Sequence, residues 1–339
     1  MKKKIIRFIL PAMLASMVIA GCGKDSSGAS GVQFEAVGAD ENSQSSENAA
    51  AGAEDAGTNA GDAGAEAEGA VSDEGQGSQL YEDFLSGNAK AKFTGEADLA
   101  SYINLGNVLT KGESYTLEEI IKNCENGDET GTYPYTGNQS HRYIDCGKDG
   151  NQELLVELGF DSEFTLEMIV KDMGGELNII YSRDQWSRSG LEIADDGTIE
   201  SYGSGGATIH VYDKAYIDAA GKYHFFYGSE EYGCPYSYYA VKDGDYVVLD
   251  FEGMNAEQFM VISYWTSEEE NHDCYYTLCE LDPDYNICYN DELYLDSNPF
   301  KQKFDEAGVP VCTVDEVTQI LKEKAAETGY PIAADFSLR

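Results

Sequence analysis

Between residues 124 and 313, apolar and polar residues mostly alternate with a period of about two, the pattern of half-buried β-strands. Three pairs of such segments each flank an Asp-Gly dipeptide, which tolerates the positive φ angles of a tight hairpin turn. The expected strand pairs are 142–146 with 153–159, 190–194 with 198–202, and 236–241 with 246–251. Further strands are expected at 223–227, 258–265 and 274–281.

A second pattern, with apolar residues three and four positions apart, predicts helices at residues 80–87, 116–123 and 314–328. Thr116 with Glu119, and Thr313 with Glu316, have the spacing of a capping box, and Gly329 follows the last helix. The expected fold is therefore α+β and β-rich, an antiparallel meander of hairpins with a few flanking helices.

The composition changes abruptly near residue 80. Residues 23–78 consist mainly of Ala, Gly, Ser, Asp and Glu with one aromatic residue, Phe34, whereas all 24 tyrosines lie at or after Tyr81. A segment of that composition cannot bury enough apolar surface to offset the entropy of ordering the chain. The expected organisation is a signal peptide at 1–21, a disordered acidic tether at 22–79 and a folded β-rich domain at 80–339.

The amino terminus has the layout of a secretory signal. Four basic residues among the first seven precede an apolar stretch at 8–20, which ends in Ile19-Ala20-Gly21-Cys22. This stretch is short for a bilayer span, which needs roughly 20 residues, and suits a signal peptide. A branched apolar residue, two small residues and a cysteine, in that order, resemble the lipobox of bacterial lipoprotein precursors.

The resemblance implies a lipid anchor at Cys22. In that family a diacylglyceryl group is attached to the thiol, and a peptidase cuts the chain before the cysteine, here after Gly21. Two acyl chains anchor a protein stably where one binds only marginally. The folded domain would then be extracytoplasmic and tied by its lipid to the bacterial cell membrane. An ordinary secretory signal with a chance cysteine, or a retained transmembrane helix, are the alternatives.

The charge excludes several classes of partner. The chain has 22 Lys and Arg against 62 Asp and Glu, a formal net charge of −40. Nucleic-acid binding needs a basic surface, and so does electrostatic docking on anionic lipid, so neither is expected. No H-E-x-x-H, G-x-S-x-G, S-x-x-K or phosphate-binding loop occurs, so no catalytic residue is assigned.

Trp186 stands between Arg183 and Arg188, two of the few arginines in the folded part. A Trp face with guanidinium groups nearby can hold a sugar or an anionic ligand. These three residues are therefore a candidate binding site. The alternative is a core tryptophan whose neighbouring arginines pair with the abundant carboxylates.

Residues 145–153 resemble the acidic loop of FG-GAP and integrin-like calcium repeats. The resemblance implies a calcium site, with oxygen ligands at alternating positions supplied by Asp145, Asp149, Asn151 and Glu153. Gly147 departs from the pattern, because the family has a third ligand there. The alternative is a hairpin without metal that buries one face of its second strand, namely Leu154, Val156 and Leu158. No other cofactor is expected.

Two cysteines lie symmetrically about Pro283-Asp284, where proline favours a turn. A hairpin centred there places Cys279 opposite Cys288, and opposite residues come close enough for a disulfide.

The function favoured by these features is binding or interaction at the cell surface, without catalysis, by a lipoprotein whose ligand or protein partner is unknown. The alternative is a secreted hydrolase of the glycosidase kind, because paired carboxylates are easily assembled in so acidic a chain. A purely structural lipoprotein is a third possibility.

Limited proteolysis of the full chain tests the domain organisation. We expect rapid trimming of the first 79 residues and a resistant core of about 260 residues, because only the latter can form a packed interior. Slow amide hydrogen exchange between residues 23 and 79 would contradict the tether.

Overall fold

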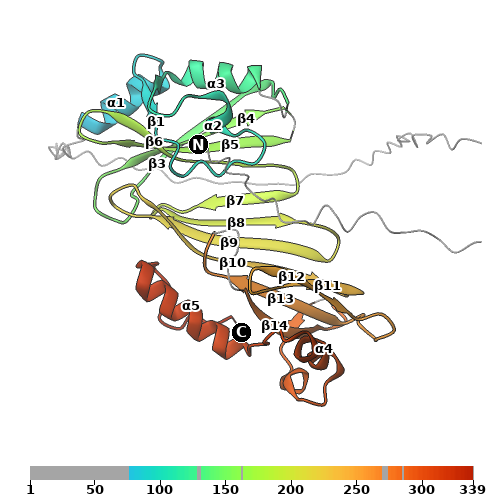
Figure 1. The fold of residues 1–339 in the computed structure, drawn as a ribbon. Helices are drawn as coiled ribbons and strands as arrows, with labels where there is room; N and C mark the ends of the chain where they lie inside the picture. The colour runs from blue at the N-terminus through green and yellow to red at the C-terminus, as the bar shows by residue number, and fades with distance from the viewer. Residues whose placement is uncertain (1–75, 128–130, 162, 269–273, 285, 339) are drawn as a thin grey trace, which may run out of the picture. The chain divides into compact units, whose positions relative to one another are not determined.

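A computed structural model describes residues 76–127, 131–161, 163–268, 274–284 and 286–338 (Figure 1). The expected signal peptide, Cys22 and almost all of the tether lie outside these ranges. The fold is β-rich α+β, as the hydrophobic pattern predicts: two large, mainly antiparallel sheets, one separate hairpin and a few helices. Within the described ranges, no helix is both long enough and apolar enough to cross a bilayer.

The first sheet has the strand order β2-β1-β6-β5-β4-β3. Strands β3 to β6 form an antiparallel meander, whereas β1 lies parallel to β6, a pairing that the hairpin pattern does not predict. The strands are β1 (Ala91–Phe93), β2 (Ser114–Tyr115), β3 (Tyr135–Ile144), β4 (Glu153–Phe160), β5 (Phe164–Asp172) and β6 (Leu177–Gln185).

The second sheet has the order β15-β14-β13-β10-β9-β8-β7, and all its pairs are antiparallel. Between β10 and β13 the chain forms the hairpin β11–β12, which is a separate two-stranded sheet. The strands are β7 (Ser189–Ile193), β8 (Thr198–Ser204), β9 (Ile209–Ile217), β10 (Tyr223–Gly233), β11 (Ser237–Lys242), β12 (Asp245–Asp250), β13 (Phe259–Trp265), β14 (Cys274–Leu281) and β15 (Ile287–Cys288).

Residues whose side chains cap the helix mark the starts of α3, α4 and α5. Both expected capping boxes are present, Thr116 with Glu119 at α3 and Thr313 with Glu316 at α5. Helix α4 was not expected, although the Asn298 side chain caps its start. The elements are α1 (Gln76–Leu85), α2 (Leu105–Val108), α3 (Leu117–Asn126), the short 3₁₀ helix η2 (Asp291–Tyr294), α4 (Pro299–Ala307) and α5 (Val314–Thr328).

The three Asp-Gly dipeptides all lie between paired strands, but only one forms the two-residue turn. Asp243 and Gly244 have φ angles of 51° and 81°, as a type I′ turn requires. Asp196 is not in the positive-φ region, while Gly197 is, which is typical of a three-residue turn. The connection that holds Asp149 and Gly150 spans residues 145–152 and is a longer loop.

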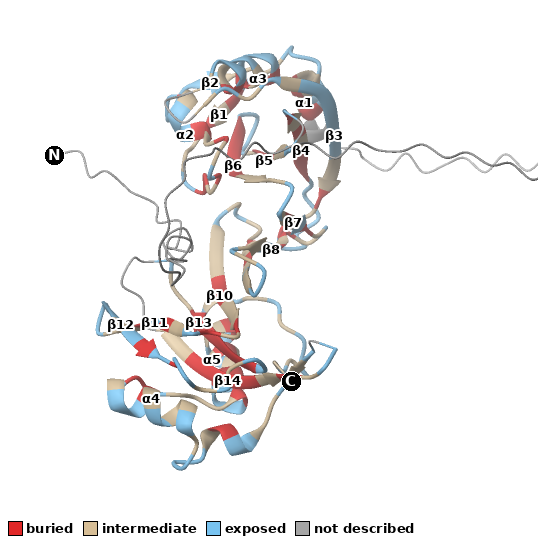
Figure 2. Cartoon of the chain, turned by 90° about the vertical axis from the view of Figure 1, so that its right-hand side faces the viewer, coloured by how far each residue is buried: buried red, intermediate tan, exposed pale blue. Residues whose placement is uncertain are grey.

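Strands β4 and β5 are buried on both faces. One face of β4 contributes Leu154, Val156 and Leu158, all fully buried as the metal-free hairpin predicts, to a core that also contains residues of α1, α2 and α3. The opposite face contributes Leu155 to a second core, which contains Ile199 and other residues of β7, β8 and β9. Buried residues therefore run along consecutive positions of β4 (Figure 2).

The second sheet also packs on both faces. The hairpin β11–β12, η2 and α4 share one core with β13 and β14, and Phe300 of α4 stacks on Phe259 with ring centroids 3.8 Å apart. Helix α5 lies on the other face, where Val317 and Leu321 pack with Ile262 of β13. All seven residues of β13 are buried as a result.

The expected disulfide is wrong by one position. Strand β15 pairs with β14 so that Cys288 lies opposite Glu280, not Cys279. Because neighbouring residues of a strand point to opposite faces, Cys279 is buried and Cys288 is exposed.

A buried ion pair joins β4 and β5 at one end of the second core. The Glu153 carboxylate is fully buried, accepts a hydrogen bond from the backbone N–H of Cys146 at 2.7 Å, and contacts the ammonium group of Lys171. A buried carboxylate that loses its counter-charge is strongly destabilising.

Lys171→Met should therefore lower the free energy of unfolding by about 3 kcal/mol. The double variant Lys171→Met with Glu153→Gln should recover part of this loss, because no charge is then left unpaired in the core. Urea denaturation of the two variants measures both effects. A double variant that is less stable than Lys171→Met alone would show that the pair is not the source of the loss.

Candidate functional site

Trp186 lies in the tight connection between β6 and β7. The backbone N–H of Trp186 donates to the Ser189 hydroxyl at 2.9 Å, and the Ser189 N–H donates back to the Trp186 carbonyl at 2.9 Å. The indole is half-buried. It contacts Tyr102, with ring centroids 6.2 Å apart, and the guanidinium carbon of Arg188 lies 5.8 Å from its centroid. Trp186 and Arg188 are thus together, as the sequence predicts.

Arg183 has a different role. Its Nη1 and Nη2 atoms each donate to one oxygen of Asp213, both at 2.9 Å, which links β6 of the first sheet to β9 of the second. The Asp213 charge holds the guanidinium protonated and raises its pKa, against the opposing effect of burial. This is the alternative reading of the motif: Arg183 pairs with a carboxylate and does not join Trp186 at the surface.

Two tyrosines extend the surface around Arg188. Tyr202 of β8 lies between Gly190 of β7 and Tyr212 of β9, directly opposite each in the strand register. Their side chains share one face of the sheet, and the exposed fractions are 58% for Tyr202 and 38% for Tyr212. Arg188 reaches the same face, because its Nη2 donates to the hydroxyl of Ser204 at 3.3 Å, two positions along β8.

We call Trp186, Arg188, Tyr202 and Tyr212 the aromatic face. Neither Tyr202 nor Tyr212 stands out in the sequence, because tyrosine is common throughout the folded part. The signal in the sequence that could have identified them is a tyrosine at a polar position of an alternating strand. Only the pairing of β7, β8 and β9 brings these rings next to the Trp186 turn.

The charges around the aromatic face nearly cancel. Lys214 pairs with Glu200, its direct neighbour in the β8–β9 register. The Tyr212 hydroxyl donates to Glu231 at 3.5 Å, and burial raises the pKa of that carboxyl. Arg188 is exposed and adds one positive charge. The face is therefore close to neutral, although the chain as a whole is strongly acidic.

The Asp145 loop uses its carboxylates to hold its own backbone. Asp145 accepts from the N–H groups of Asp149, at 2.9 Å, and Gly150, and Asp149 accepts from the N–H of Asn151 at 2.8 Å. This last bond lowers the pKa of Asp149. Glu153 points into the core and contacts Lys171, so it is not at the surface with the other three.

The four expected calcium ligands are thus not gathered around one point, and no group of three or more His, Cys, Asp or Glu side chains suited to a metal occurs among the described residues. An open hollow of about 470 Å³ lies beside the loop, with Lys148, Asp195, Asp196 and Thr198 in its lining. The Lys148 ammonium already pairs with Asp196 at 3.0 Å. Calcium binding at Asp145, Asp149 and Asn151 stays a prediction.

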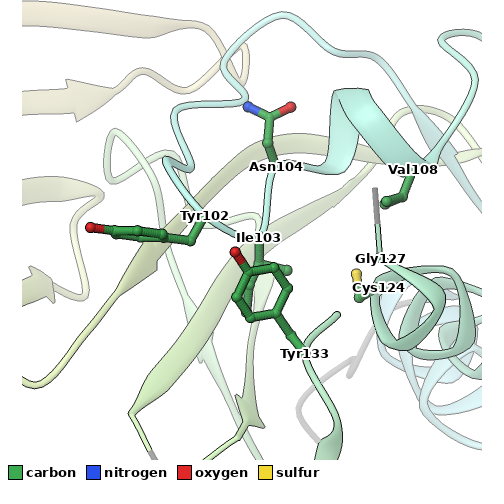
Figure 3. A pocket seen from close by; sticks show the side chains of 7 residues that line it. All are labelled: Tyr102, Ile103, Asn104, Val108, Cys124, Gly127 and Tyr133. Carbon is green, nitrogen blue, oxygen red and sulfur yellow. The ribbon is translucent and has the colours of Figure 1, made fainter. Parts of the chain in front are cut away.

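A small pocket beside the first core is too small for an organic ligand. Its volume is about 10 Å³, room for roughly one water molecule. Figure 3 shows the residues that line it: Tyr102, Ile103, Asn104, Val108, Cys124, Gly127 and Tyr133.

Two carboxylates face each other on β4 and β5. Glu157 and Glu167 are direct partners in the strand register, and Glu167 is only 3% exposed. Burial, followed by the nearby Glu157 charge, raises the pKa of Glu167 to about 7, against the opposing effects of Arg142 and a 2.7 Å hydrogen bond from Gln185. The Ser140 hydroxyl donates to Glu157. Nothing in the sequence distinguishes this pair from the many other acidic residues.

Comparison with known proteins yields no relative from which a role could be taken: no family model, no curated protein and no solved structure matches the chain at a significant level. The candidate sites therefore rest on the geometry of this chain alone.

Glu167 should make stability fall as the pH rises. Its pKa is higher in the folded chain than the ordinary 4.5, so folding favours the protonated form and the folded state loses stability between about pH 4.5 and about pH 7. Glu167→Gln should be similar in stability to the unmodified chain near pH 5, and more stable by on the order of 3 kcal/mol near pH 8.

Urea denaturation at several pH values measures this difference, and Glu200→Gln, at a more exposed position, is the matched control. A stability difference for Glu167→Gln that stays constant across the pH range would contradict the assignment.

Proposed function

We propose that this chain is a lipid-anchored, extracytoplasmic binding protein without catalytic activity. The lipobox at Ile19-Ala20-Gly21-Cys22 supports the anchor and the location, and the acidic segment that follows supports a tether between the lipid and the folded domain. For a flexible chain of that length the root-mean-square reach is roughly 40 Å. The domain would thus search a volume near the membrane for its ligand or protein partner.

The observation that carries the binding role is the aromatic face. Exposed aromatic side chains on a rigid sheet lose little conformational entropy on binding, and they offer both an apolar ring and a polar group. Tyr202 and Tyr212 are presented in this way on β8 and β9, and the half-buried ring of Trp186 lies in the connection that leads into β7. Flat surfaces of this kind suit extended ligands better than small molecules, which favour concave sites.

A carboxylate-based hydrolase is the second candidate, and one observation favours it. Glu167, whose carboxyl has a raised pKa, lies directly opposite a second carboxyl, that of Glu157, and glycosidases also work with a pair of carboxyl groups. The release of reducing sugar ends from polysaccharides, abolished by Glu167→Gln, would support this candidate. The near-complete burial of Glu167 argues against it, because a catalytic acid has to reach its substrate.

Replacing the lipidated cysteine tests the anchor. Cys22→Ala should abolish metabolic labelling with a fatty acid and should release the protein from the membrane fraction, because no other residue of the motif carries a thiol. Cys288→Ala, at an exposed cysteine of the folded part, is the control and should behave as the unmodified chain. If Cys22→Ala still partitions into detergent, the anchor assignment is wrong.

Cosedimentation with insoluble cell-wall material tests the binding role. The full chain should sediment with this material, and Tyr212→Ala should weaken sedimentation severalfold, because one exposed ring is lost from the aromatic face. Equal sedimentation of Tyr212→Ala and the unmodified chain would reject this face as the binding surface.

A further inference from the structure

The ring of Tyr202 packs over Gly190 of the neighbouring strand. A Cβ atom placed on Gly190 would overlap the Cζ, Cε1 and hydroxyl oxygen of Tyr202, so the ring occupies the space directly above the glycine backbone. The ring thus packs against Gly190, while 58% of the side chain remains exposed. An aromatic ring packed over a glycine of the neighbouring strand is held in place without help from a ligand.

The groups next to Tyr202 extend the aromatic face and add polar groups along its edge. Tyr212 lies on the next strand, roughly 4.8 Å to the side. The Ser204 hydroxyl lies two positions from Tyr202 on β8 and accepts a hydrogen bond from Arg188, whose guanidinium group also lies 5.8 Å from the centroid of the Trp186 ring. The surface thus combines ring faces with guanidinium and hydroxyl groups that form hydrogen bonds. A pyranose ring has the matching chemistry, with C–H groups on one face and hydroxyl groups around its edge.

The charge of the surface selects among ligands that stack on rings. Lys214 is neutralised by Glu200, and the charge of Arg188 is offset on the same face by the carboxylates of Glu192 and Glu231, so the face has no excess of positive charge. Nucleic acids and anionic polysaccharides would meet a chain with a formal net charge of −40, without a basic surface to offset the repulsion. A neutral polymer meets no such barrier.

We propose that the aromatic face binds neutral polysaccharides, with sugar rings stacked on Tyr202 and Tyr212 and hydroxyl groups held by Arg188. This rests on the proposed function, since it names the ligand class of the same surface. Several sugar units can contact the row that runs from Trp186 to Tyr212. Because one polysaccharide chain contacts several rings at once, the weak contributions of the individual rings to binding combine.

The test uses the full chain in detergent and measures binding to insoluble β-glucan, xylan and mannan, with polygalacturonate as the anionic comparison. At least one neutral polysaccharide should bind. Tyr202→Ala should weaken that binding by about tenfold, the usual loss for one stacking ring. Tyr202→Phe should bind as the unmodified chain does, because it keeps the ring. Tyr239→Ala is the matched control: Tyr239 is also 58% exposed, but it lies on the separate hairpin β11–β12.

The outcomes separate the ligand class from the proposed function. If Tyr202→Ala and Tyr239→Ala bind neutral polysaccharides equally well, or if only polygalacturonate binds, the proposal is overturned. If no neutral polysaccharide binds but cell-wall material still sediments the chain in a Tyr212-dependent way, the ligand class is wrong and the binding role stands. If neither probe depends on these tyrosines, the aromatic face has no binding role and both proposals fail.

Discussion

The apolar layer shared by the two large sheets is the constraint on which the rest of the fold depends. Strand β4 has consecutive apolar residues, Leu154, Leu155 and Val156, so it can be stable only where both of its faces are covered. Helices α1, α2 and α3 cover one face, and strands β7, β8 and β9 cover the other. One face of those three strands packs on this layer. On their opposite face, Tyr216 contacts the end of α5 and Tyr330, whereas Tyr202 and Tyr212 remain exposed. The exposure of Tyr202 and Tyr212 follows from that arrangement.

Local signals in the sequence predict local structure well. Capping boxes locate α3 and α5, and Asp-Gly dipeptides locate three strand connections, because each depends on residues only a few positions apart. The parallel pairing of β1 with β6 joins segments about 85 residues apart in the sequence, so no local pattern predicts it. Strands β1, β2, β5, β6 and β9 are missing from the expected elements. Of these, β9 (Ile209–Ile217) has a partly alternating pattern from which a strand could have been predicted.

The candidate sites were predictable only in part. Trp186 and Arg188 stand out because Trp and Arg are rare in the folded part, and they do lie together. Arg183 is only one position further from Trp186 in the sequence, but its side chain on β6 pairs with Asp213 of the other sheet. The acidic loops are also hard to interpret from the sequence alone. Three of their residues each accept hydrogen bonds from two backbone N–H groups of the loop that follows: Asp145, Asp218 and Asp282. A carboxylate that shapes a turn looks in the sequence like one that holds a metal.

The position of α1 has a mechanical consequence. Any tension transmitted along the chain from residues before Gln76 enters the described fold through this helix. Tyr81 and Phe84 fasten α1 in the first core, and the Tyr81 hydroxyl links it to Gln152 and Asp172 at the ends of β4 and β5. A pull from the amino-terminal side is therefore borne by the first sheet. The exposed tyrosine rings belong to the second sheet, so they are not part of the elements that α1 contacts directly.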